Sequence, residues 1–164
     1  KEQRSDGLQS LKFTDKAGLP AHYFPMLTVA PNHATGVTTC SFDVWLEPKA
    51  YFVHEWRDQA SPYHAGPTFT LKDGKLVGPT GPLIDIPSGQ WVHYEVTATI
   101  GAATTGTWTL KVTPTGGATK AFTDLPFRSK ELRTVNWIGF ISNANEPSAF
   151  FLDQLSLTTT DPNR

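Results

Sequence analysis

Apolar and polar side chains alternate along several stretches of this chain, as they do in half-buried β-strands. In residues 36–47, Phe42 and Val44 share one face with apolar neighbours, while mostly polar side chains occupy the other. Residues 90–100 repeat the pattern, with Tyr94 on the apolar face. No stretch has the 3.6-residue period of an amphipathic helix, so the pattern predicts an all-β fold.

The alternating stretches predict roughly ten to eleven strands, separated mostly by turns. They fall at residues 9–14, 25–29, 36–47, 50–57, 66–77 (two strands joined by Asp73-Gly74), 83–86, 90–100, 106–113, 134–142 and 148–158. One short helical turn is expected within 127–133. Such a series folds as a two-sheet antiparallel β-sandwich of the jelly-roll type. We expect one domain over residues 1–164, with its core in 7–158 and a short tail at each end.

Composition narrows the function classes. The 164 residues include 13 Gly and 13 Pro, only 18% are charged, and the net charge is −1. A net charge this close to zero predicts no broad basic surface for nucleic acid or anionic lipid. The chain also has no apolar run long enough to span a membrane. The single Cys40 excludes an internal disulfide and is expected to be buried. Because the sequence starts at Lys1 without Met, we expect a processed chain or a module of a larger protein. We further expect that protein to be secreted, extracellular or periplasmic, and the module to be a monomer.

Four short motifs carry a family resemblance. They are Gly-Gln-Trp at 89–91, Gly-Thr-Trp at 106–108, Trp-Ile-Gly-Phe at 137–140 and Phe-Phe-Leu-Asp-Gln-Leu at 150–155. Their order resembles concanavalin-A-like sandwiches and the carbohydrate-binding jelly rolls of carbohydrate-active proteins, over most of residues 7–158. The resemblance implies a non-catalytic carbohydrate-binding module of a polysaccharide-active protein. Its partners would be a polysaccharide or oligosaccharide and the neighbouring domains of the parent protein.

Asp153 occupies an unexpected position in the last strand. Alternation places it on one face with Phe151 and Leu155, where a carboxylate is desolvated unless it is paired. In many carbohydrate-binding jelly rolls the Asp of the last strand holds a structural calcium ion. The resemblance therefore implies Ca²⁺ at Asp153, with Asp6 or Glu2 as a further ligand. The alternative is that Asp153 accepts backbone N–H groups or pairs with an arginine.

Sugar binding needs flat aromatic faces together with planar polar side chains. The densest such cluster is Trp56, Arg57, Asp58, Tyr63 and His64. We expect the two aromatic rings to stack on sugar, and Arg57 and Asp58 to contact hydroxyl or carboxylate groups; the guanidinium suits an acidic or sulfated sugar. The alternative is an Arg57–Asp58 pair that closes a solvated loop.

Two further tryptophans, Trp45 and Trp91, lie on the more polar faces of their strands and are candidates for the same role. Core packing is the alternative for both of them and for Trp56. Trp108 and Trp137 align with apolar neighbours and are expected in the core.

An enzyme is the alternative to a binding module. A small polysaccharide lyase would centre on His54, Arg57, Tyr63, His64 and Tyr94. A glycoside hydrolase needs two carboxylates at a defined separation, and no paired carboxylate motif is present, which disfavours an enzyme. A second alternative is a structural module that packs against a neighbouring domain.

Overall fold

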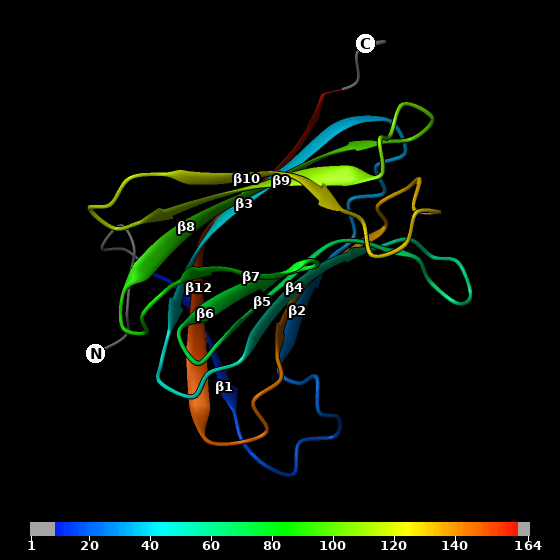
Figure 1. Ribbon diagram of the computed structural model, residues 1–164. Helices are drawn as coiled ribbons and strands as arrows, with labels where there is room; N and C mark the ends of the chain where they lie inside the picture. Colours follow the sequence, from blue (N-terminus) through cyan, green and yellow to red (C-terminus); the bar gives the residue numbers. More distant parts are fainter. Residues whose placement is uncertain (1–8, 161–164) are drawn as a thin grey trace.

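Two antiparallel sheets of six strands pack face to face in the computed structural model, which describes residues 9–160 (Figure 1). Sheet A has the order β1-β12-β3-β8-β9-β10, and sheet B has the order β2-β11-β4-β5-β6-β7. The strands are β1 (Leu11–Asp15), β2 (Met26–Val29), β3 (Gly36–Leu46), β4 (Phe52–Arg57), β5 (Ala65–Lys72), β6 (Lys75–Gly78), β7 (Gly81–Asp85), β8 (Trp91–Ile100), β9 (Thr107–Pro114), β10 (Lys120–Pro126), β11 (Trp137–Ser142) and β12 (Ser148–Thr160). Within residues 9–160, no helix is long and apolar enough to cross a membrane.

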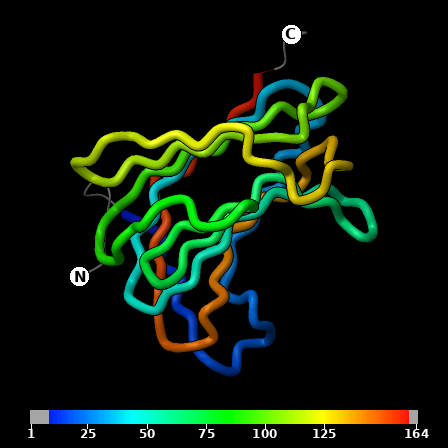
Figure 2. Tube along the Cα trace, viewed as in Figure 1, coloured from blue at the N-terminus to red at the C-terminus, as the bar shows by residue number. Residues whose placement is uncertain are grey.

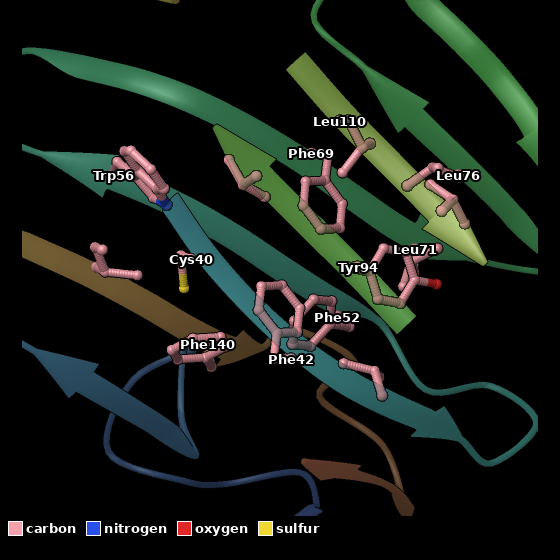
Figure 3. Packing of buried hydrophobic residues seen from close by; sticks show 14 of the residues in the cluster. Cys40, Phe42, Phe52, Trp56, Phe69, Leu71, Leu76, Tyr94, Leu110 and Phe140 are labelled. Carbon is pink, nitrogen blue, oxygen red and sulfur yellow. The ribbon is translucent and has the colours of Figure 1, made fainter. Parts of the chain in front are cut away.

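The expected all-β sandwich is confirmed, and on β3 and β8 the inner faces are the ones that alternation predicts. Phe42 and Tyr94 of sheet A and Phe69 and Phe140 of sheet B are buried between the sheets. In Figure 3 these rings point toward one another from both layers, and the Phe42 ring meets Phe140 edge-on at 5.0 Å between centroids. Burying such aromatic area supplies most of the favourable free energy of folding.

The strand count exceeds the prediction by one, because β10 was not foreseen. Its burial does not alternate: Leu125 is its one buried side chain. The strand pairs only with β9 and bulges between Phe122 and Leu125, and Asp124 has a φ of 56°. An exposed, bulged edge strand has no period-two signal to read. Residues 130–131 form a turn, so the helical turn expected within 127–133 is absent.

The first and last described strands lie side by side in sheet A, which Figure 2 shows as a blue segment beside an orange-to-red one. β12 also pairs with β3, and its register shifts between Asp153 and Ser156. Up to that bulge, Phe150 and Leu152 face the core. Asp153 is only half-buried, and its Oδ1 accepts the N–H of Gln154 at 2.8 Å. Asp153 therefore accepts a backbone N–H group, as one of the alternatives expects, but its carboxylate is not buried on an apolar inner face.

The side chains of the candidate site lie on the outer face of sheet B, which the β4–β11 pairing organises. Gly139 lies opposite Glu55, and Trp137 lies opposite Arg57. On the other side of β4, Thr68 of β5 also lies opposite Glu55. Side chains directly opposite on one face are close neighbours, so this register brings distant parts of the sequence together.

Candidate functional site: a cationic groove on sheet B

A groove of about 730 Å³ lies over the outer face of sheet B. Its floor is apolar, with Met26 of β2, Ile141 of β11 and Val53 of β4. Around this floor stand polar and aromatic side chains from β4, β11 and four connecting loops, namely His22, Tyr23, Glu55, Arg57, Tyr63, Arg128, Trp137 and Asn143. An apolar floor with convergent polar groups is typical of a ligand site.

The guanidinium of Arg57 is held between two aromatic rings. Its central carbon lies 4.2 Å from the ring centroid of Tyr63 and 4.1 Å from that of Trp137. Cations bind aromatic faces at such distances, and the planar guanidinium stacks especially well. Its Nε donates to Glu55. Among residues 9–160 the terminal amino groups of Arg57 have no hydrogen-bond partner, so they are left for a ligand.

Glu55 is the buried counter-charge of this site, with only 3% of the residue exposed. It pairs with Arg57, and its Oε2 accepts from Arg128 Nη1 at 3.0 Å and from Thr68 Oγ1 at 3.4 Å. A buried carboxylate requires such partners because desolvation otherwise disfavours its charge. Arg128 keeps 66% of its side chain exposed. Two arginines against one carboxylate leave an excess of positive charge in the groove.

Gly139 explains how Trp137 lies flat on the sheet. A Cβ at this position would overlap the six-membered ring of the Trp137 indole. The ring therefore covers the glycine of the same strand, beside Glu55 on the neighbouring strand. Any side chain at residue 139 would lift the indole and disturb the stack on Arg57.

The loop between β4 and β5 carries Tyr63 and is closed by Asp58. Asp58 Oδ1 accepts the N–H groups of Ala60 (3.1 Å) and His64 (2.8 Å), and its Oδ2 lies 2.7 Å from Nδ1 of His64. Burial alone would raise the pKa of Asp58, but these hydrogen bonds outweigh it and hold the pKa below its usual value. Asp58 and His64 thus shape the loop, and neither lines the groove.

Some residues of the predicted cluster lie in the core instead of the groove. Trp56 is 0% exposed and lies among the buried side chains of the core (Figure 3). Its Nε1 donates to Nε2 of His54 at 2.8 Å. A stacking role for Trp56 is therefore wrong, because neither ring face is reachable. His54 and Tyr94 are buried as well, which removes both from the set considered for a lyase. The cause is strand alternation: His54 and Trp56 point inward, whereas Glu55 and Arg57 point outward.

Trp45 and Trp91 lie on the other sheet. They are directly opposite each other on β3 and β8, half-buried on the outer face of sheet A. Trp45 packs edge-on against Phe151, with 5.3 Å between ring centroids. Neither residue can contact a ligand that lies in the groove of sheet B.

Sequence reasoning missed several groove residues. Trp137 was expected in the core, but both faces of β11 are apolar there, and the inner one is occupied by Ile138 and Phe140. Arg128 and Asn143 belong to loops whose position depends on long-range packing, so no local pattern identifies them.

Asp153 is the expected metal ligand that lies within the described residues. Asp6 and Glu2 lie outside the described residues. Within residues 9–160, no three His, Cys, Asp or Glu side chains gather as metal ligands do. Asp153 lies opposite Asp43 on β3, whose carboxylate contacts His93 Nδ1 at 2.6 Å. Calcium at Asp153 stays a prediction.

Several solved polysaccharide lyases share this architecture. A PL-14 alginate lyase from Aplysia kurodai matches with a TM-score of 0.62 and 10% identity, over 92% of this chain and 83% of that one. An endo-β-1,4-glucuronan lyase from Trichoderma reesei has a TM-score of 0.54 and 12% identity, over 92% and 80%. A mutant of alginate lyase Aly36B, in complex with alginate tetrasaccharide, has a TM-score of 0.52 and 11% identity, over 96% and 83%. No family model and no curated protein matches this chain.

These likenesses establish the fold class. The chain has the concanavalin-A-like jelly-roll sandwich found in carbohydrate-active proteins, as its sequence motifs indicated. At 10–12% identity the likeness extends to the fold alone.

Proposed function

We propose that this chain binds an acidic polysaccharide, a polymer of uronate units, in the groove of sheet B. The observation that carries the proposal is the Arg57 guanidinium, clamped between Tyr63 and Trp137 with its terminal amino groups turned to no protein partner. A guanidinium binds a carboxylate through two parallel hydrogen bonds. The clamp fixes the orientation of Arg57, so less conformational entropy is lost when a ligand binds.

The same stack disfavours a neutral sugar as the ligand. A neutral pyranose is recognised largely through stacking on open aromatic faces. Here Arg57 covers one face of each ring, and the Trp137 indole also lies against Gly139. Besides the rings of Tyr23 and Tyr63, the groove offers the donors of Arg57 and Arg128, and these donors match a carboxylate.

A polymer is favoured over a single sugar because the hollowed surface continues beyond Arg128. Arg128 also borders a second hollow of about 420 Å³, which Thr70 of β5 and Val77 of β6 help to line. From β2 to β6 the sheet spans four inter-strand spacings, roughly 19 Å. A chain of several sugar units would cross both hollows, with Arg57 and Arg128 each near a carboxylate.

Isothermal titration calorimetry with size-defined uronate oligosaccharides tests the proposal. We expect affinity to rise with oligosaccharide length and to fall with salt, and we expect no binding of neutral cello-oligosaccharides. Arg57→Gln should weaken binding at least about tenfold, because hydrogen bonds to charged groups are the stronger ones. Lys111→Gln removes the same charge from the outer face of sheet A, where Lys111 pairs with Glu95, and serves as the matched control. Equal affinity for neutral oligosaccharides, or none for any acidic one, would refute the proposal.

A second candidate is a lyase that cleaves the same polymer by β-elimination. The observation that favours it is that the exposed Tyr63 and His22 stand in one groove with two guanidiniums. An arginine would neutralise the uronate carboxylate while a base removes the C5 proton. The electron pair forms a C4–C5 double bond, the C4–O bond breaks, and the departing oxygen takes a proton. Ultraviolet absorbance of the unsaturated product distinguishes the candidates: its growth supports a lyase, and its absence with bound polymer supports a binding module.

We further propose that this chain acts outside the cell, because such polymers are too large to enter cells. We also propose that it is part of a larger polysaccharide-active protein. A neighbouring catalytic domain would gain rate through the raised local concentration of its substrate. The test is to compare the rate of the parent protein with and without residues 1–164 on soluble and on insoluble polymer. Removal of a binding module should lower the rate most on the insoluble polymer.

A further inference from the structure

Asp15, the last residue of β1, has a carboxyl group that is buried and yet faces no cation. The residue is 1% exposed, and within residues 9–160 it forms no ion pair. Its Oδ2 accepts three hydrogen bonds: from Ser142 Oγ at 2.6 Å, from the N–H of Ala144 at 3.0 Å and from the N–H of Asn145 at 3.3 Å. Its Oδ1 is buried with no partner among the described residues.

The donors are Ser142, the last residue of β11, and Ala144 and Asn145 just after that strand, and this stretch of the chain reaches the groove. Asn143 lies between the donors and lines the groove. Its amide oxygen is buried and has no hydrogen-bond partner among residues 9–160. The next polar residue, Asn145, donates from Nδ2 to the carbonyl oxygen of His22 at 3.4 Å, and His22 also lines the groove. The carboxyl of Asp15 therefore fixes the chain on both sides of Asn143.

A buried carboxyl group without a counter-charge lowers stability relative to a well-packed apolar side chain. Such a cost is commonly found where function requires a fixed geometry. We propose that Asp15 is a positioning residue that holds the Asn143 side chain in the groove, where its NH₂ group donates a hydrogen bond to the bound uronate polymer. The identity of the ligand rests on the proposed function, whereas the positioning role of Asp15 rests on the geometry of its hydrogen bonds alone.

The replacement of Asp15 by Asn separates geometry from charge. An asparagine can place its oxygen where Oδ2 now lies and its NH₂ where Oδ1 has no partner. We expect Asp15→Asn to keep uronate binding within about threefold, whereas Asp15→Ala should weaken it about tenfold, as should Asn143→Ala. If Asp15 acts through Asn143, the double variant Asp15→Ala/Asn143→Ala binds no more weakly than Asn143→Ala. Should Asp15→Ala fail to fold, Ser142→Ala, which removes one donor, replaces it in the cycle.

A ligand-independent measurement accompanies the cycle. The side-chain amide resonances of Asn143, measured by NMR, should shift in Asp15→Ala and stay in place in Asp15→Asn. Losses of affinity that multiply in the double variant, or unchanged Asn143 resonances in folded Asp15→Ala, overturn the positioning role. If the natural protein binds no uronate oligosaccharide, the proposed function fails, and the NMR comparison alone decides the positioning role.

Discussion

Acidification from pH 7 to pH 5 should destabilise this protein through one buried histidine. His54 lies in the core among Phe42, Phe69 and Phe140, at ring-centroid distances of 4.7–5.3 Å. Burial lowers the pKa of His54 from 6.5 to about 3, opposed only in part by the backbone of Gly139. The imidazole is thus neutral in the folded protein at pH 5, and its Nε2 accepts from Trp56.

The sign of the effect follows from proton binding. Between pH 6.5 and 3 the unfolded chain binds a proton at His54 that the folded chain does not, so the free energy of unfolding falls as pH falls. At pH 5 the free energy of unfolding is lower by about 2 kcal/mol, and the total decrease between pH 6.5 and pH 3 approaches about 5 kcal/mol. The lowered pKa of His33 acts in the same direction. The lowered pKa of Asp58 removes stability only as pH falls through its own, more acidic range.

Urea unfolding followed by tryptophan fluorescence at pH 7, 6 and 5 measures this dependence. His54→Gln keeps a hydrogen-bond acceptor for Trp56 but does not titrate, so it should lose most of the decrease between pH 7 and 5. Phe69→Leu is the control, because it truncates a neighbouring core ring without removing a titratable group. It should be less stable at every pH and keep the full pH dependence. An equal pH dependence in His54→Gln and the natural protein would refute the assignment to His54.

Three further outcomes are expected. Gly139→Ala should displace the Trp137 indole and weaken uronate binding about tenfold, with a loss of about 1–3 kcal/mol in stability, measured by calorimetry and urea unfolding. Burial raises the pKa of the Cys40 thiol to about 12, so a thiol reagent at pH 8 should modify it only at the rate of unfolding; fast labelling of native protein would contradict this. If calcium binds at Asp153, EDTA should lower the melting temperature, and Asp153→Ala should abolish that effect. Identical melting curves with and without EDTA would refute calcium binding.

The inner faces of the sandwich were predictable because alternation is a local property. Phe42 and Tyr94 each have a polar residue before and after them in the sequence, so the local pattern alone assigns their side chains to the core. The same reading failed at Trp137, where apolar residues occupy both faces of β11. It also failed at β10, where one buried side chain in seven residues leaves no pattern.

The candidate site was only partly predictable, for a related reason. Arg57 and Tyr63 stood out because they are close in sequence, within one polar and aromatic cluster. Their partners Trp137 and Arg128 come from about 70–80 residues further along the chain, and the β4–β11 register that aligns Trp137 with Arg57 is a property of the folded sheet. The sequence suggested an Arg57–Asp58 pair, whereas outward-facing Arg57 meets Glu55, its neighbour two positions away on the same face.

The position of Glu55 explains why the groove can be cationic without being unstable. Two unpaired guanidiniums side by side would repel each other, and a fully neutralised pair would attract no anion. One buried carboxylate shared by Arg57 and Arg128 avoids both outcomes. It orders Arg57 through Nε, leaves the terminal amino groups of that side chain accessible, and keeps one positive charge in excess. A uronate carboxylate completes this arrangement, because it brings the missing negative charge and two acceptor oxygens to donors that are already oriented.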